Sequence, residues 1–203
     1  MDPLGKLEEI FRHFPGIGPR QAKRFVYHLL TRQNSELNEL SKLVIELKQH
    51  ISICQMCYRF FNVNGNSLCN ICRDANRDNS ILMVVSRDID LQAVDRSRAY
   101  NGLYFVLGGT VPILEEHPEG MIRQKELLDR LAKNPDIKEV ILATNLNPEG
   151  EHTAEHLSRV IRDQATRLQA TVRLSMLGRG LSTGTELEYS DSETLRSALE
   201  NRR

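Results

Sequence analysis

The 203-residue sequence predicts a protein of mixed α and α/β class. Apolar residues recur at helical spacing through the first fifty positions, whereas short apolar runs alternate with helical stretches after about residue 80. A loop with four cysteines lies between these regions. We therefore expect a helical domain over residues 1–52, a cysteine-rich finger over 53–78, a parallel α/β domain over 79–175 and a mainly helical C-terminal tail over 176–203.

The N-terminal region contains three apolar stripes with the spacing of amphipathic helices. Their members are Leu4, Leu7, Ile10 and Phe11, then Ala22, Phe25, Val26, Leu29 and Leu30, then Leu37, Leu40, Leu43, Val44 and Leu47. The segment 14–19 (FPGIGP) separates the first two stripes, and its prolines and glycines predict a tight turn. Pro19 suits the first turn of the second helix, because that position needs no backbone N–H.

Short apolar runs beyond residue 80 are typical of buried parallel strands. These runs are Ile81–Val85, Leu103–Leu107, Val140–Ala143 and Thr171–Leu174. The helical stretches expected around them are Ile89–Arg96, Met121–Lys133, Glu149–Ile161 and a last helix at about Asp191–Leu199. This alternation predicts a parallel sheet covered by helices.

The four cysteines form two matched C-x2-C pairs, Cys54 with Cys57 and Cys69 with Cys72, separated by eleven residues. This pattern is typical of one tetrahedral Zn²⁺ bound by four thiolates. Two disulfides or a redox C-x2-C are the alternatives. The N-terminus lacks the apolar segment of a secretory signal, so we expect reduced thiols, and a redox motif needs no second pair. We expect one structural zinc ion per chain, without an open coordination position.

The charge distribution indicates an anionic partner for the N-terminal region. Basic and acidic residues number 27 each, so the net charge gives no such signal. No acidic residue lies between Glu9 and Glu36, however, although this interval contains five basic residues: Arg12, Arg20, Lys23, Arg24 and Arg32. A solvated helix face is the alternative interpretation. No apolar run is long enough to cross a membrane, and we expect a cytoplasmic protein.

Residues 14–25 resemble a helix-hairpin-helix motif. Gly16 and Gly18 permit a sharp turn, and N–H groups beside a helix N-terminus can bind an anionic oxygen. Three basic residues of the following helix share one solvent face. Such a site binds phosphate without reading bases, so we expect sequence-independent DNA binding; a plain helix connector is the alternative. The expected DNA-binding residues are Gly16, Gly18, Arg20, Lys23 and Arg24.

The order of hairpin, four-cysteine loop and α/β domain resembles the RecR family of bacterial recombination mediators over essentially the whole chain. Further matching stretches are residues 69–78 (CNICRDANRD), 104–109 (YFVLGG), 143–145 (ATN), 149–150 (EG), 187–191 (LEYSD) and 194–195 (TL). The resemblance implies a Toprim domain near residues 80–175 and a dimeric or tetrameric homo-oligomer that encircles or clamps DNA. It also implies a protein that works with RecO and RecF to load recombinase on gapped DNA, and we expect this protein to be non-enzymatic and nucleoid-associated.

The α/β domain departs from the pattern of Toprim enzymes at their carboxylates. Those enzymes carry a Glu after the first strand and an Asp-x-Asp after a later one, where this chain has Ser86 and then Asn145 and Asn147. Asp88 and Asp90 are near but fall on the following helix. Because Mg²⁺ chemistry needs clustered carboxylates, we expect a binding scaffold. The alternatives are a residual Mg²⁺-dependent nuclease or primase-like enzyme and a zinc-bearing interaction module without a DNA role.

Two further motifs have competing interpretations. His152, Glu155 and His156 spell the H-x-x-E-H pattern of inverzincin metallopeptidases. A catalytic zinc needs a third protein ligand, so we expect helix-surface histidines instead. The glycine-rich stretch 178–184, with Arg179, lacks the Lys-Ser/Thr of a P-loop. We expect it to be a flexible connection and expect no nucleotide hydrolysis.

Overall fold

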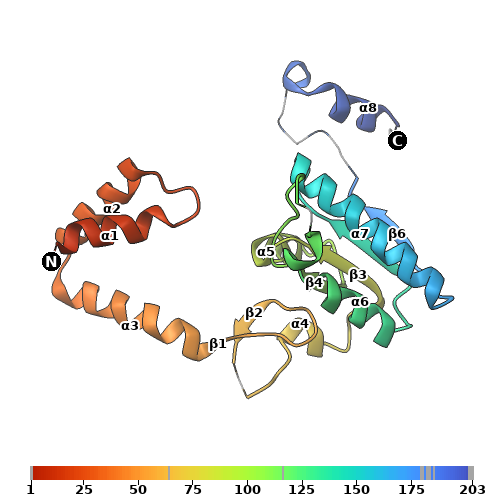
Figure 1. Ribbon diagram of the computed structural model, residues 1–203, viewed down its shortest axis with the longest axis horizontal. Coiled ribbons are helices and arrows are strands. Elements are labelled where there is room, and N and C mark those ends of the chain that lie inside the picture. The colour runs from red at the N-terminus through yellow and green to blue at the C-terminus, as the bar shows by residue number, and fades with distance from the viewer. Residues whose placement is uncertain are drawn as a thin grey trace. The chain divides into compact units, whose positions relative to one another are not determined.

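The computed structural model forms two compact units, Met1–Ser52 and Ile53–Arg203 (Figure 1). The described residues are 2–63, 65–115, 117–178, 181, 184 and 186–200. Arg179 and Gly180 of the glycine-rich stretch lie outside them. Within the described part of the chain, no helix combines the length and the hydropathy needed to cross a bilayer.

The first unit consists of three helices: α1 (Pro3–Arg12), α2 (Pro19–Leu30) and α3 (Asn34–His50). Helices α1 and α2 pack against each other through aromatic edges, because the Phe11 ring lies 5.6 Å from that of Phe14 and 5.7 Å from that of Phe25. Ala22 and Val26 of α2 are buried at this contact. Phe25 stays 37% exposed, so it only partly faces the core as the apolar stripe suggested.

Helix α3 leaves its apolar stripe uncovered. None of its seventeen residues is buried. Leu43, Val44 and Leu47 are 55%, 58% and 58% exposed. Burying a leucine or valine side chain contributes roughly 1.5–3 kcal/mol, so a folded protein gains by covering this face.

A four-stranded parallel sheet forms the centre of the second unit, which confirms the predicted fold class (Figure 1). Its strands are β3 (Asp78–Val85), β4 (Gly102–Val106), β5 (Glu139–Ala143) and β6 (Arg173–Met176), in the order β4-β3-β5-β6. Val84 of the central strand aligns with Phe105 on one side and Leu142 on the other. The last strand begins two residues later than expected, because pairing starts where the Arg173 N–H donates to the Lys138 carbonyl at 2.8 Å.

Two helices cover one face of this sheet, and a third helix together with the cysteine loop covers the other. The covering helices are α5 (Asp88–Ser97), α6 (Gln124–Lys133) and α7 (Pro148–Arg167). Leu82 and Val84 point into a core shared with α6 and α7. Met83 and Val85, one residue out of step, point into a second core shared with α5 and the cysteines. The cysteine loop is therefore part of the hydrophobic core of the α/β unit.

Shorter elements complete the chain. They are β1 (Ile51–Ile53), β2 (Phe60–Asn62), α4 (Asn70–Arg73), the 3₁₀ turns η1 (Pro118–Gly120) and η2 (Leu187–Tyr189), and α8 (Ser192–Glu200). Strands β1 and β2 pair with each other and flank the first cysteine pair.

Gly150 allows α7 to start close to the end of β5. A Cβ added there would overlap the Asn145 carbonyl oxygen and lie 2.9 Å from its carbonyl carbon, and both are backbone atoms that cannot rotate away. Asn147 caps the same helix start, because its Oδ1 accepts from the Gly150 N–H at 2.8 Å. The sheet and α7 therefore approach at a distance that only glycine permits.

Gly150→Ala should therefore lower the free energy of unfolding by about 3 kcal/mol, as overpacking against backbone does. Gly120→Ala is the matched control, since a Cβ there meets nothing within 4 Å, and it should change stability by less than about 0.5 kcal/mol. Urea unfolding followed by circular dichroism measures both values. Equal midpoints for the two variants would show that the sheet and α7 do not require this close approach.

Candidate metal centre and nucleic-acid interface

The four cysteine sulfurs converge at one point of the second unit. The Sγ atoms of Cys54, Cys57, Cys69 and Cys72 all lie within 4.8 Å of one another, and Cys57 and Cys69 are 3.6 Å apart. Zn–S bonds of about 2.3 Å place the sulfurs of a tetrahedron about 3.8 Å apart, close to this spacing. A disulfide needs about 2.05 Å, so the arrangement fits a shared metal ion and not two disulfides.

Two short turns hold the sulfurs in place. Tyr58, in the left-handed conformation at φ 60°, returns the chain after the first pair, and its N–H donates to the Cys54 carbonyl at 2.9 Å. The Cys69 N–H donates to the Cys54 Sγ at 3.3 Å, a bond that a thiolate accepts well. The Cys54 contact raises the pKa of Cys69, but hydrogen bonds with Cys57 and Cys72 outweigh it and lower that pKa to about 6. Contacts among the same sulfurs lower the pKa of Cys54 and raise the pKa of Cys57 and Cys72, so without a metal ion the four groups share protons that metal binding must release.

The cysteine loop also covers the open edge of β4, the outermost strand of the sheet on that side. The Val106 N–H donates to the Cys57 carbonyl at 2.8 Å. At the start of β2, the Phe60 N–H donates to the Asp88 Oδ1 at 2.8 Å, which joins the loop to α5. The cysteine loop is therefore attached at one point to the sheet and at another to α5.

Within the described residues, the four cysteines are the one group of three or more His, Cys, Asp or Glu side chains that could share an ion. His152 contacts the Val111 carbonyl at 3.3 Å, and His156 contacts the Gln124 side chain. Burial, followed by the Arg159 charge, lowers the pKa of His156. The H-x-x-E-H histidines are thus half-buried structural groups of α7, not fully solvated ones, and the described residues give them no third ligand.

The carboxyl ends of the strands, where Toprim enzymes bind Mg²⁺, carry no cluster of carboxylates among the described residues. Ser86 is fully buried, and its hydroxyl has no hydrogen-bond partner among them. Asn147 serves as the cap of α7. Asp88 accepts from Phe60, as described above, and the Asp90 Oδ2 accepts from the Arg87 N–H at 2.9 Å. Both nearby aspartates therefore stabilise backbone groups.

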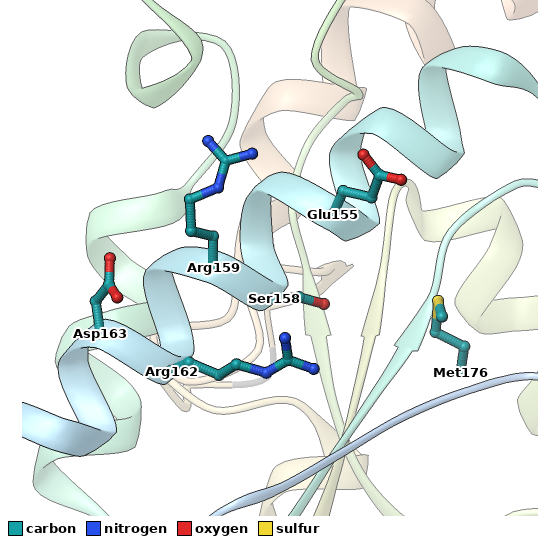
Figure 2. Close-up of a pocket in the computed structure, with 6 residues that line it drawn as sticks. All are labelled: Glu155, Ser158, Arg159, Arg162, Asp163 and Met176. Atoms are coloured by element: carbon teal, nitrogen blue, oxygen red, sulfur yellow. The ribbon is translucent and has the colours of Figure 1, made fainter.

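An open pocket of about 470 Å³ lies beside α7 and the end of β6 (Figure 2). Arg162 extends toward the side of Met176, whereas Arg159 and Asp163 point to the opposite side of the helix (Figure 2). The lining contains two acidic residues, Glu155 and Asp163, as well as the two arginines. Opposite charges in equal number create no strong field of one sign, so this pocket does not resemble a phosphate site.

The hairpin of the first unit has the backbone geometry of an anion site. Gly16 has φ 76°, a conformation that favours glycine, and Gly18 is the N-cap of α2. A Cβ at either glycine would meet nothing within 4 Å, so the turn faces open space. A phosphate oxygen can therefore approach the N-terminus of α2, where the helix dipole favours negative charge.

Basic side chains continue this surface along α2. Arg20, Lys23 and Arg24 are exposed, and no ion pair within the described part of the chain includes them. Arg32 differs, because it lies 3.9 Å from the Glu36 carboxylate. The cationic face of the hairpin therefore consists of three side chains beside the glycine turn.

Comparison with known proteins identifies these parts. Residues 4–47 match the RecR helix-hairpin-helix family, residues 80–173 the Toprim domain, and residues 180–203 the RecR C-terminal family. The chain is 41% identical over 200 residues to the recombination protein RecR of Cutibacterium acnes, covering 98% of this chain and 94% of that protein. The chain belongs to the RecR family. RecR of Chloroflexus aggregans is 41% identical over 201 residues (99% and 93% coverage), and RecR of Heliobacterium modesticaldum 38% over 202 residues (100% and 96%). The expected family resemblance is confirmed.

Sequence patterns gave no sign of three arginines that cap carbonyl groups on the free edge of β4 in this RecR protein. Arg77 donates to the Gly102 carbonyl at 3.3 Å, Arg130 to that of Tyr104 at 2.7 Å, and Arg123 to that of Val106 at 3.0 Å. Their partners are 17 to 26 residues away in sequence, so no local spacing marks them. Arg77, the second of the two arginines in the 69–78 motif, is one of them, which gives part of that family stretch a structural role.

Proposed function

We propose that this protein is a non-enzymatic DNA-binding clamp that acts in recombinational repair. The exposed glycine turn with Arg20, Lys23 and Arg24 beside it is the observation that carries the proposal. The turn and the N-terminus of α2 receive a phosphate, and the three cations bind neighbouring phosphates. None of these groups reads base edges, so binding is independent of sequence. The relatives named above, which are recombination proteins, support the repair role.

A homo-oligomer is part of this proposal. The chain has no net charge, so one copy attracts DNA only weakly through the three cations of its hairpin. Linking several hairpins in one assembly raises the effective concentration of each for DNA already bound by another. The uncovered apolar face of α3 supplies surface for such association. We infer a dimer or tetramer, with RecO- and RecF-like proteins as partners in loading recombinase on gapped DNA.

Zinc is the ion we assign to the four-sulfur centre. Four thiolates in tetrahedral geometry favour Zn²⁺ over the hard cations Mg²⁺ and Ca²⁺, which prefer oxygen. Four protein ligands leave no position for water or substrate, so the ion stabilises the loop and performs no reaction. Cys54, Cys57, Cys69 and Cys72 would hold it.

A Mg²⁺-dependent nuclease or primase-like enzyme is the competing hypothesis, because the Toprim match covers residues 80–173. Its geometry is unfavourable, since Asp88 and Asp90 bind backbone N–H groups and the usual carboxylate positions hold Ser86, Asn145 and Asn147. Strand cleavage or primer synthesis that requires Mg²⁺ and is lost in Asp88→Asn would establish this hypothesis instead.

Replacing Arg20, Lys23 and Arg24 together with Gln should abolish measurable DNA binding at about 0.1 M salt, because the phosphate contacts dominate affinity. Fluorescence anisotropy with two DNA duplexes of unrelated sequence measures this loss, and the parent should bind both equally. The matched control replaces Lys6, Lys42 and Lys48, which are exposed in the same unit, with Gln. This control variant loses the same number of positive charges, at positions away from the glycine turn. It should keep most of the parent's affinity for DNA.

Parental affinity in the hairpin variant would contradict the assignment of the hairpin. Equal losses in both variants would show that net charge alone drives binding. A parent protein that does not bind DNA at any salt concentration would support the alternative hypothesis of a zinc-bearing interaction module without a DNA role.

Elemental analysis of the purified full chain should find one zinc ion per chain. Cys57→Ser should lose the zinc and lower the urea midpoint of the second unit, because metal binding contributes directly to its folding free energy. Two zinc ions per chain would revive the metallopeptidase interpretation, and a chain that binds no zinc would contradict the metal assignment.

A further inference from the structure

Arg130 is the one charged side chain that is buried among the described residues, at 6% exposure. Its Nη1 donates to two carbonyl oxygens, those of Met56 and Tyr104, each at 2.7 Å. Its Nε and Nη2 are buried and have no hydrogen-bond partner among the described residues. A buried guanidinium with unused donors costs several kcal/mol unless a negative charge lies near.

No carboxylate of the described residues provides that charge, because none of the ion pairs found there includes Arg130. The other largely buried arginine, Arg77, differs in this respect. It lies 2.6 Å from the Asp95 carboxylate. Arg130 therefore needs a counter-charge from a different source.

The position of the cysteine centre makes it the source of this negative charge. Met56, whose carbonyl accepts from Arg130, lies between Cys54 and Cys57 in the first C-x2-C pair. Burial lowers the pKa of Arg130, and attraction to the sulfurs of Cys72, Cys57 and Cys54 opposes this shift. The guanidinium and the sulfurs thus share one buried region at the edge of β4.

The net charge of a zinc-loaded site also indicates that Arg130 and the cysteine centre compensate each other. Zn²⁺ with four thiolates carries a net charge of −2, from +2 on the ion and −4 on the sulfurs. Cys54, Cys57 and Cys69 have no exposed surface and Cys72 is only partly exposed, so water would solvate little of this charge. The loaded site would therefore be a largely buried anion, and the buried Arg130 cation is linked to it through the carbonyl of Met56, between Cys54 and Cys57.

We propose that Arg130 is the counter-ion of the loaded zinc site and holds the first cysteine pair against β4. This inference rests on the zinc assignment above. Arg130 is a positioning residue: its charge offsets the net negative charge of the zinc-loaded site, and its two hydrogen bonds join the Met56 carbonyl to the Tyr104 carbonyl. Loss of the arginine charge leaves the negative charge of the loaded site unbalanced and so favours release of the metal.

Zinc release from the full-length, zinc-loaded protein to the chromogenic chelator 4-(2-pyridylazo)resorcinol tests the proposal. Arg130→Gln keeps an N–H donor and removes the charge, whereas Arg130→Lys keeps the charge and loses the planar fork. We expect Arg130→Gln to release zinc 10–100-fold faster than the parent, the usual range for a lost neighbour of a metal ligand. Arg130→Lys should stay within about fivefold. Arg77→Gln is the matched control, since Arg77 also donates to a β4 carbonyl but has its own counter-charge in Asp95, and it should release zinc at the parental rate.

Release from Arg130→Gln at less than ten times the parental rate would overturn the proposal, as would equal acceleration in the Gln and Lys variants. If Arg130→Gln does not fold, Arg130→Lys decides alone: release within fivefold of the parent supports the counter-ion role, and faster release overturns it. Zinc content of the parent is measured first. A parent without zinc contradicts the metal assignment, whereas a zinc-loaded parent with unaffected variants contradicts only the role of Arg130.

Discussion

The free edge of β4 is the constraint on which the second unit depends. An edge strand presents N–H and C=O groups that have no partner within the sheet. Unless other groups of the protein form hydrogen bonds with them, the edge can pair with a strand of another chain. Here the Cys57 carbonyl accepts the Val106 N–H, and three arginines donate to the carbonyls of Gly102, Tyr104 and Val106. The cysteine loop therefore serves as a substitute for a fifth strand. A metal that holds this loop also holds the edge of the sheet.

In the Toprim domain, residues that follow the strands are helix caps and backbone partners: Asn147 caps α7, Asp90 caps α5, and Asp88 joins the cysteine loop to α5. Each of these bonds uses an oxygen that would otherwise be available to Mg²⁺. The groups to which we assign DNA binding lie in the hairpin of the first unit, where glycine backbone and three cations face solvent.

Local sequence patterns predicted the fold class, the order of the elements and the convergence of the cysteines, because spacing and turn residues act over a few positions. The long-range contacts carried no such signal. Asp88 and Phe60 are 28 residues apart, and Arg130 and Met56 are 74 apart. From sequence alone, a buried arginine in an amphipathic helix cannot be distinguished from a solvated one, because its burial depends on where the neighbouring strand lies. Likewise, the stripe on α3 predicts a helix but does not say what covers its apolar face.

Amide hydrogen exchange across the sheet, followed by mass spectrometry in zinc-loaded and metal-free protein, tests most directly whether the metal centre supports the sheet. Removing zinc should accelerate exchange in β4 (Gly102–Val106) at least tenfold, because the Val106 N–H loses its partner when the loop is released. Exchange in α2, which belongs to the other unit, should not change. Unchanged protection of β4 after complete removal of the metal would show that the sheet does not depend on the cysteine loop.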